Sequence, residues 1–516
     1  MTIKYIDTRG LTDKPYEFGE VIIKGIAPGG GLFVPERIPQ LTLEEILSLA
    51  DMTYAQAAAF IYKRFETDFS DEEIDKLMAQ AYSNNFDTAE IAPVKRVGEQ
   101  YVLELWHGPT SAFKDMALQC LPLFFSAAIE KQRAAGVPGS ERDFLIAVAT
   151  SGDTGKAALA GFANKDHINI EVFYPYGGVS DIQFKQMTTQ IGSNVNVTGV
   201  RGNFDDCQTS VKEMFNDAAF NKTLSEKYNT VLSSANSINW GRLLPQIVYY
   251  VNSYAQMVKK NIVKAGKKID VTVPTGNFGN ILACWYAKEM GTPIKRIVCA
   301  SNANRVLTDF IETGTYSIKN REFILTSSPS MDILVSSNLE RQLFEFANRD
   351  ASCIRKWMSD LNSKSAFTVN DEVKEALQTN YGYGSVSDIE CFRGIFETYN
   401  DLFYLLDPHT AVAYRMASLY RNVNPMLVVS TAHWAKFGKD VYRALLNMKP
   451  GEEFDEYING LTGAQLNKII TELTYTNGAP KALDELDDAP IRFNNVISGA
   501  KEDIEKSTIE FLSSLQ

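Results

Sequence analysis

Runs of apolar residues alternate with glycine-rich loops and helical patterns through the middle of the chain. The run Phe144–Ala149 is apolar at every position, which is typical of a strand buried on both faces of a sheet. A helical stretch of small residues follows, and a second apolar run begins at Ile168. The same order recurs at Val271–Val273 and Ile297–Cys299, with a loop and a helical stretch between them. Repeated units of strand, loop and helix predict parallel sheets with helices on both faces.

The regions on either side of this repeating part have different patterns. Residues 1–90 combine short apolar runs with helical stretches and predict an N-terminal α/β domain. Residues 91–385 form the predicted core, which includes a smaller substrate domain at about 140–200. Residues 386–516 are mostly helical by pattern, and we expect them to complete the core and to end in a helical tail. Apolar residues at helical spacing predict a core-packing helix at 241–262.

Composition and charge limit the class of protein and its partners. Hydrophobic residues make up 45% of the 516 positions and charged residues 22%, as in ordinary globular proteins. The net charge of -12 argues against nucleic acid or a membrane surface as a partner, because both attract basic faces. No run reaches the roughly 18 apolar residues of a membrane span, and Met1–Asp7 lacks the apolar region of a signal peptide. We therefore expect a cytoplasmic monomer or homodimer that acts on a small molecule.

Cysteine and histidine residues indicate neither a disulfide framework nor a metal site. The six cysteines are scattered without a Cys-x-x-Cys pair, so we interpret them as small buried hydrophobes in a reducing compartment. None of the four histidines has the spacing of a helical metal pair, and we predict no metal ligand.

Lys114 lies in the segment Trp106–Asp115 and has apolar neighbours on both sides. Desolvation disfavours an ammonium group and lowers its pKa, so a buried Lys114 would present a neutral amine that can form a Schiff base. The alternative is a lysine whose charged end reaches solvent along an apolar surface. His107, in the same segment, is a candidate for orienting Lys114 or a substrate group, or else a core histidine.

Two loops between a strand and a helix have features of ligand-binding sites. The loop 275–280 contains two glycines, which allow backbone N–H groups at a helix start to approach an anion, and it predicts a phosphate cradle. The alternative is a glycine-rich turn without a ligand. The loop 151–155 does not fit a nucleotide-binding P-loop, because Thr150 replaces its first glycine and Ala157 replaces its magnesium ligand. Neither loop spells Gly-x-Gly-x-x-Gly, which disfavours a dinucleotide. A phosphate cradle, a polar loop and a buried lysine are the parts that a pyridoxal phosphate enzyme requires.

These motifs resemble those of threonine synthases, which are pyridoxal phosphate enzymes of the tryptophan-synthase-β-like fold, in the branch with an added N-terminal domain. The similar segments follow one another over most of the chain: Tyr5–Gly10, Ala27–Pro35, Trp106–Asp115, Ser151–Gly155, Asn236–Arg242, Gly276–Asn280, Ser328–Ile333 and Ser430–His433. Two positions depart from the family pattern, since Trp434 replaces a proline and Gly29 replaces an aspartate. The resemblance implies an α/β fold of two open-sandwich domains, each based on a parallel sheet, around a cofactor cleft, plus the N-terminal α/β domain.

The resemblance also implies which residues bind the cofactor. Lys114 would bind pyridoxal 5'-phosphate as a Schiff base and would be the catalytic residue. Thr431 would hydrogen-bond the pyridine nitrogen, and its neutral hydroxyl would not force that nitrogen to stay protonated. Without the family match, Thr431 would be interpreted as a buried hydroxyl that the backbone satisfies. The residues expected around the cofactor phosphate are Gly276, Asn277, Phe278, Gly279 and Asn280.

The implied reaction converts O-phospho-L-homoserine and water to L-threonine and phosphate by γ-elimination and β-addition. The candidates for substrate contact are Ser151, Asp153, Thr154, Asn239, Arg242 and His107. Arg242 suits the substrate phosphate best, because its planar fork can bind two oxygens; the alternative is an exposed arginine at a helix start. Asp153 would repel a phosphate, so we expect it near the cofactor's ring oxygen or the substrate amine. Two other functions stay open: a dehydratase or phospho-lyase of the same fold that gives a 2-oxo acid, and a non-catalytic metabolite-binding homologue.

Overall fold

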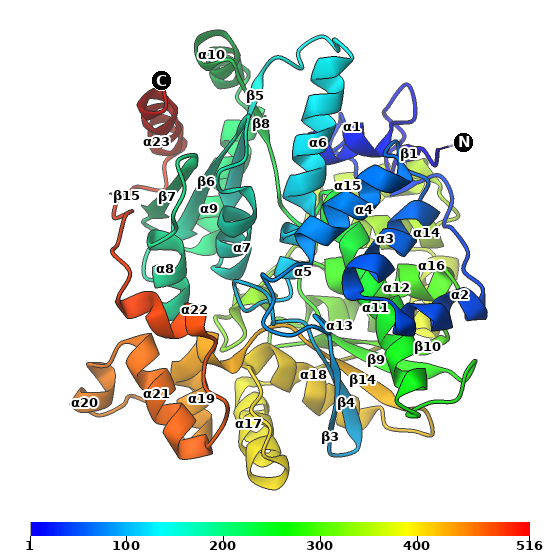
Figure 1. The fold of residues 1–516 in the computed structure, drawn as a ribbon, viewed down its shortest axis with the longest axis vertical. Helices are drawn as coiled ribbons and strands as arrows, with labels where there is room; N and C mark the ends of the chain where they lie inside the picture. Colours follow the sequence, from blue (N-terminus) through cyan, green and yellow to red (C-terminus); the bar gives the residue numbers. More distant parts are fainter. Residues whose placement is uncertain (1) are drawn as a thin grey trace.

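Two parallel sheets, each covered by helices, form the body of the protein. The structure is a computed structural model that describes residues 2–516. Figure 1 shows the two units side by side, one around a six-stranded sheet and the other around a five-stranded sheet. This architecture confirms the predicted α/β class with two domains based on parallel sheets.

The larger sheet combines five parallel strands with one antiparallel edge strand. Its strands, in spatial order, are β13 (Tyr381–Ser385), β10 (Ile294–Ser301), β9 (Ile269–Pro274), β14 (Met426–Ser430), β4 (Gln100–Glu104) and the antiparallel β3 (Val94–Val97). The helices of this unit are α5 (Asp115–Leu118), α6 (Leu121–Ala134), α11 (Trp240–Lys259), α12 (Gly279–Glu289), α13 (Val306–Thr313), α14 (Leu339–Phe346), α16 (Asp371–Asn380), α17 (Asp388–Leu402) and α18 (Pro408–Leu419). Every residue of β9 is buried, including Asp270 and Thr272, because helices cover both faces of this sheet.

The smaller sheet is parallel throughout and contains both early and late parts of the chain. Its strands, in spatial order, are β15 (Val496–Ile497), β7 (Val195–Val200), β6 (Ile168–Pro175), β5 (Asp143–Ala149) and β8 (Thr230–Ser233). Its helices are α7 (Asp153–Phe162), α8 (Asp181–Thr188), α9 (Phe204–Asn216), α10 (Ala218–Tyr228) and the C-terminal α23 (Lys501–Ser514). Three of these strands fall within the predicted range of about 140–200, whereas β8 and β15 lie outside it. A strand of two residues such as β15 is too short to leave a pattern in the sequence.

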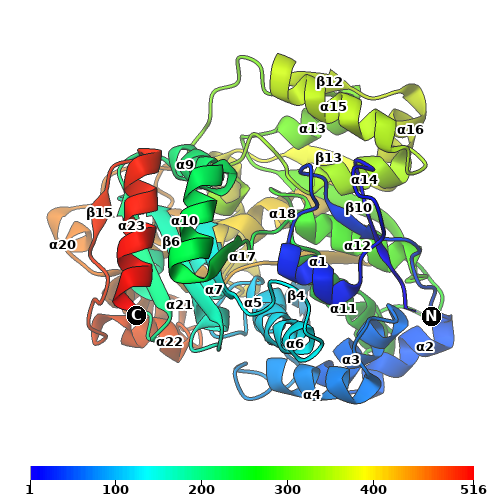
Figure 2. The same cartoon turned by 90° about the horizontal axis from the view of Figure 1, so that it is seen from above.

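The N-terminal region packs against the larger unit. It consists of an antiparallel strand pair and short helices: β1 (Tyr5–Asp7), β2 (Phe33–Pro35), α1 (Phe18–Lys24), α2 (Leu43–Ser48), η1 (Leu49–Asp51), α3 (Tyr54–Arg64) and α4 (Asp71–Ala81). Figure 2 shows these helices beside α11, and α2, α3 and η1 contact it. The sequence pattern predicted one buried face for α11, but the helix is buried on nearly all sides because the N-terminal helices cover the second side.

The remaining elements complete the two units, and one of them, η3, is buried throughout. They are β11 (Thr315–Ser317) and β12 (Ala366–Thr368), which pair antiparallel, then η2 (Pro329–Met331), α15 (Ala351–Lys364), η3 (Trp434–Phe437), α19 (Gly438–Leu445), α20 (Glu456–Asn459), α21 (Gly463–Thr474), α22 (Lys481–Asp484) and η4 (Glu485–Asp487). All six cysteines are free, and five of them are buried. None of the helices within residues 2–516 has the length and apolar character needed to cross a membrane.

The C-terminal helix α23 is attached to the smaller sheet through a buried carboxyl group. Glu171 on β6 is fully buried and accepts hydrogen bonds from Asn196 (2.9 Å), Ser507 (2.8 Å) and Thr508 (2.7 Å). Burial raises the pKa of Glu171 from 4.5 to about 7, although the three hydrogen bonds oppose this shift. The charged form therefore destabilises the folded state.

Replacing Glu171 with glutamine is expected to remove part of the pH dependence of stability. Because the pKa is raised on folding, the stability of the natural protein is greatest below about pH 4.5 for this group and falls until about pH 7. A pKa change of this size corresponds to roughly 3 kcal/mol. Unfolding temperatures at pH 5.5 and 7.5 should therefore differ less for E171Q than for the natural protein. Glu510→Gln, on the exposed side of α23, is the control; equal differences in all three proteins would contradict the prediction.

Candidate active site

A cavity of about 200 Å³ lies where strands of both sheets end. The loops after β5, β9 and β14 contribute to its wall, in keeping with the usual ligand position at the carboxyl ends of parallel strands. The start of α11 and residues 329–337 close further sides. The residues predicted from the sequence that line this cavity are Lys114, Ser151, Thr154, Arg242, Gly276, Asn277, Phe278, Gly279, Asn280 and Thr431.

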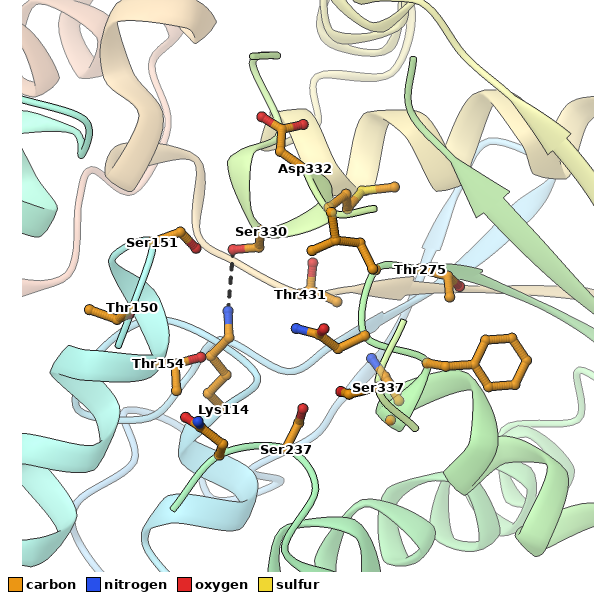
Figure 3. A pocket seen from close by; sticks show the side chains of 18 of the residues that line it. Lys114, Thr150, Ser151, Thr154, Ser237, Thr275, Ser330, Asp332, Ser337 and Thr431 are labelled. Carbon is orange, nitrogen blue, oxygen red and sulfur yellow. Dashed lines mark hydrogen bonds between the residues drawn. The ribbon is translucent and has the colours of Figure 1, made fainter. Parts of the chain in front are cut away.

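Lys114 presents its amine to this cavity from a buried position. Its side chain is about nine-tenths buried, and Nζ lies 3.3 Å from both Asp153 Oδ2 and Ser330 Oγ. Figure 3 shows the amine directed at the Ser330 hydroxyl, with Thr154 and Thr431 nearby. Burial lowers the pKa of Lys114 and the neighbouring cations act in the same direction, whereas Asp153 opposes the shift. The neutral amine that the sequence predicted is therefore more accessible at Lys114 than at an exposed lysine.

Backbone pairing holds the Lys114 segment against the strand end that carries Thr431. Phe113 N donates to Thr431 O (2.8 Å), and Ala112 and Ala432 form an isolated antiparallel bridge. His433 N donates to Ser111 O (3.1 Å). The predicted cofactor lysine and the predicted partner of the pyridine nitrogen thus come from distant parts of the chain and are fixed relative to each other.

The loop between β9 and α12 has the donors of an anion site. Phe278 adopts a left-handed conformation (φ 61°) directly before the helix, at a general cost of about 1–2 kcal/mol. Within the described chain, the backbone N–H groups of residues 276–281 donate no hydrogen bond, and they lie at a helix start that favours negative charge. Asn280 Oδ1 accepts from Tyr249 and Tyr250 (2.6 Å each), which leaves its buried nitrogen without a partner among residues 2–516. These donors fit the phosphate of pyridoxal phosphate.

Replacing Gly276 with alanine is expected to weaken cofactor binding about tenfold or more. An added Cβ would lie 2.8 Å from Ser330 O and 3.2 Å from the Met331 Cα, and both are backbone atoms that cannot rotate away. Overpacking of this kind generally costs about 1–3 kcal/mol, which is about 5- to 150-fold in a dissociation constant, and a clash with backbone atoms belongs in the upper part of that range. Absorbance titration of the cofactor-free protein with pyridoxal phosphate measures the change.

Gly279→Ala provides the comparison within the same loop. Its Cβ would meet only side chains, those of Asn338 at 3.4 Å and Ser237 at 3.9 Å. We expect its effect on the dissociation constant to be clearly smaller than that of G276A. The opposite order would contradict the close approach of Gly276 to the segment around Ser330 as the reason for glycine at position 276.

The loop after β5 places two hydroxyl groups at the cavity and one carboxylate behind them. Ser151 and Thr154 line the cavity, whereas Asp153 does not. Asp153 begins α7 and is 3% exposed. Burial alone would raise its pKa, but Lys436 and Lys114 hold it well below the usual range. Asp153 is therefore a carboxylate that contacts the Lys114 amine, and its predicted place near the cofactor's ring oxygen or the substrate amine stays a prediction.

Arg242 is a buried cation without a carboxylate partner. It lies in the first turn of α11, is 3% exposed and donates from Nη1 to Ala235 O (3.0 Å). Its Nε atom is buried and has no hydrogen-bond partner within the described residues. Burial lowers its pKa to about 10. This environment contradicts the alternative of an exposed helix-start arginine and suits an anion that enters the cavity.

Besides Asp153, two further predicted substrate contacts, Asn239 and His107, do not line the cavity. Asn239 is fully buried, caps the start of α11 through Gly241 N and donates to Ile22 O (2.8 Å). His107 is held by Asp87 and by Glu104 (3.0 Å), and these carboxylates raise its pKa against the effect of burial. Both side chains are engaged in the protein itself, so the structure gives neither of them a place at the substrate.

Ser330 is a second polar residue beside Lys114, and the sequence predicted no role for it. Ser330 Oγ contacts Lys114, and Ser330 N donates to His409 Nε2 (3.1 Å). His409 Nδ1 in turn donates to Asp407 Oδ2 (2.8 Å), and His409 also lines the cavity. Ser330 was inside a segment similar to the family, but no spacing pointed to His409. Further polar cavity residues that the sequence did not single out are Gln208, Lys212, Asn236, Ser237, Gln246 and Asp332.

Two protein families match the chain over adjacent regions. The family described as "Threonine synthase N terminus" matches residues 4–82, and "Pyridoxal-phosphate dependent enzyme" matches residues 92–425. The second region covers more than half of the chain and contains most of the cavity wall.

Relatives and solved structures extend this similarity to the full chain. The chain is 39% identical to the threonine synthase of Schizosaccharomyces pombe, over 86% of this chain and 89% of that protein. It is 43% identical to human "Threonine synthase-like 1", over 83% of this chain, and it spans only 58% of that relative's length. The pyridoxal-phosphate-bound threonine synthase of Brucella melitensis superposes with a TM-score of 0.83 at 33% identity over 99% of each chain. Yeast threonine synthase gives 0.85 at 32% identity over 100% of this chain and 99% of the other.

Proposed function

We propose that this chain, which belongs to the threonine synthase family of pyridoxal-phosphate-dependent enzymes, converts O-phospho-L-homoserine and water to L-threonine and phosphate. One observation carries the proposal. A single cavity contains a buried amine at Lys114, an anion-binding loop at 276–281 and a separate buried cation at Arg242. The first two match a cofactor with an aldehyde and a phosphate, and the third matches a substrate that carries its own phosphate.

The chain's residues divide between holding the cofactor and orienting it. Lys114 would hold the aldehyde carbon covalently, and the N–H groups of residues 276–281 would bind the phosphate. The Thr431 hydroxyl would face the pyridine nitrogen from the end of β14. When bound, pyridoxal phosphate supplies an electron sink that stabilises negative charge on the substrate carbons near the amino group.

Lys114 is the proposed acid and base of the reaction. Burial lowers its pKa, so its amine can accept the proton of the substrate α carbon and later that of the β carbon. Asp153 and Ser330, each 3.3 Å from Nζ, limit the directions in which the amine can point. A base within hydrogen-bond reach of fixed partners keeps its geometry through successive proton transfers.

Arg242 is the proposed ligand of the substrate phosphate. Its guanidinium can donate two parallel hydrogen bonds to phosphate oxygens, and burial strengthens them because little water competes. The Ser151 and Thr154 hydroxyls on the opposite loop are proposed to contact the amino-acid part of the substrate. Contacts from both units would then surround one small molecule and exclude water until it is needed.

Product analysis tests the proposal directly. The protein is incubated with pyridoxal phosphate and O-phospho-L-homoserine, and threonine, phosphate and 2-oxobutanoate are measured. Equal amounts of threonine and phosphate support the proposal, whereas 2-oxobutanoate would identify a lyase that eliminates without adding water. That second candidate stays open because elimination without water addition would use the same amine at Lys114 and the same cation at Arg242. Absence of any phosphate release would leave the non-catalytic homologue. The cytoplasmic location and the monomeric or homodimeric state stay predictions.

A further inference from the structure

A fully buried lysine, Lys436, lies on the other side of Asp153 from the Lys114 amine. Lys436, in η3, is 0% exposed, and its Nζ lies 2.9 Å from Asp153 Oδ1. It also donates to Thr110 O (2.8 Å). The carboxylate of Asp153 therefore contacts two lysines, with Oδ1 toward Lys436 and Oδ2 toward Lys114 at 3.3 Å.

The contact with Lys436 is the stronger of the two. It is shorter, and Gln183 Nε2 donates to the same Oδ1 atom (2.8 Å), which fixes the orientation of the carboxylate. Lys436 cannot turn toward solvent, because it is enclosed and is also bound to Thr110 O. Its charge is thus a permanent neighbour of Asp153, whereas the amine of Lys114 faces the cavity.

This arrangement resolves a conflict between orientation and reactivity. A carboxylate 3.3 Å from a buried lysine orients the amine, but an otherwise unpaired carboxylate would also stabilise the ammonium form. An ammonium group can neither attack an aldehyde nor accept a proton. A second cation that neutralises the carboxylate retains the orientation and removes most of the opposing effect on the charge.

We propose that Lys436 is a positioning residue that neutralises Asp153, so that the carboxylate orients the Lys114 amine without holding it in its ammonium form. The inference rests on the proposed function in one respect, namely that Lys114 is the amine that binds the cofactor. It concerns a residue that lines no part of the cavity and that would act mainly through Asp153, while its own charge acts on Lys114 in the same direction.

Other charged groups around the pair come from several elements. Arg242 on α11 acts on Lys114 in the same direction as Lys436, because both are cations. Around Lys436 lie further titratable groups: Asp115 on α5, Lys156 on α7 and His433 before η3. Burial raises the pKa of Asp115 to about 6, so this carboxyl is mostly ionised at neutral pH, but it accepts hydrogen bonds from Thr110 N (2.8 Å) and Oγ1 (2.6 Å) and forms no ion pair with Lys436 within the described residues. Burial lowers the pKa of His433 to about 3, which leaves its ring neutral. Asp153 is therefore the main counter-ion of Lys436.

The test measures the reactivity of Lys114 rather than turnover. Cofactor-free protein is mixed with pyridoxal phosphate at pH 6 to 10, trapped with borohydride, and the labelled peptide is quantified by mass spectrometry. The midpoint of the rate against pH reports the protonation of the labelled lysine. For Lys436→Met we expect this midpoint to rise by about one pH unit or more, because Asp153 is then free to pair with Lys114. Lys436→Arg retains the cation and should stay near the natural midpoint.

Two Asp153 variants separate this effect from a merely structural one. D153N should lower the midpoint, because the carboxylate is lost and the cations remain. The double variant D153N/K436M should lack the rise seen in K436M alone. Lys185→Met is the matched control, since Lys185 pairs with Asp487 between the smaller unit and the C-terminal region but lies away from Lys114; its midpoint should not change.

The outcomes distinguish the proposed role of Lys436 from the proposed function of Lys114. An unchanged midpoint in K436M, or an equal rise in K436M and the double variant, overturns the role of Lys436. If K436M does not fold, an unchanged midpoint in D153N overturns it equally. Labelling of a lysine other than Lys114 in the natural protein would instead overturn the proposed function, and is seen before any variant is compared.

Discussion

Replacing Lys114 with alanine is expected to abolish borohydride-trapped cofactor and to lower product formation from O-phosphohomoserine about 10⁴-fold or more. Lys114 has a position that no neighbour shares: its buried amine faces the cavity and lies 3.3 Å from each of two groups that orient it, Asp153 and Ser330. Loss of a positioned acid–base group alone generally costs about 10²–10⁴ in rate, and loss of covalent attachment adds to this. Phosphate release and mass spectrometry of the trapped protein measure both effects.

Lys156 is the matched control for this experiment. It is a partly buried lysine, and desolvation lowers its pKa to about 8, so its amine is reactive by the same physical cause. However, Lys156 lies on α7 with its Nζ bound to Gln190 (2.6 Å), and it does not line the cavity. K156A should therefore retain trapping at Lys114. Trapped cofactor on Lys156, or a K114A variant that retains most of its activity, would show that a lowered pKa was mistaken for function.

The parts of the site that could be predicted from the sequence are those with a local signal. The loop at 151–155 follows an unbroken apolar run, and the loop at 275–280 follows a strand in which Val271 and Val273 flank Thr272. A parallel sheet places the ends of its strands at one edge. That geometry brings Ser151, Asn277 and Thr431 to the cavity although they are far apart in the chain. Lys114 was recognised by its apolar neighbours and by family resemblance, and its burial agrees with the first of these signals.

The parts that could not be predicted depend on contacts between distant residues. Asn239 resembled a substrate ligand beside Arg242, but its amide is required at the start of α11 and by the backbone at Ile22. His409 has no motif that marks it, and its position follows from its bonds to Asp407 and Ser330. A short polar side chain at a helix start can cap the helix or bind a ligand, and only the three-dimensional neighbours decide between these roles.

Arg242→Gln is expected to lower kcat/KM for O-phosphohomoserine about 100-fold or more, mainly through KM, while cofactor affinity changes little. Loss of a buried charge pair generally costs about 2–5 kcal/mol of binding, and the substrate phosphate would be the missing partner of this guanidinium. The unfolding temperature of R242Q in the absence of ligands should equal or exceed that of the natural protein. A buried cation without a carboxylate partner costs stability, so its removal relieves that cost.

The combination of lower activity with unchanged or higher stability is the signature of a ligand-binding role, because a structural arginine would lower both when removed. Arg242→Lys retains the charge but not the planar fork, and we expect an intermediate KM. The location of the phosphate is tested in the same series by cofactor titration. If R242Q weakens pyridoxal phosphate binding and leaves KM unchanged, Arg242 serves the cofactor phosphate instead. In that case, the substrate phosphate must use other donors of the cavity. Among the described residues that line the cavity, Lys212 on α9 is a further cation with no assigned role.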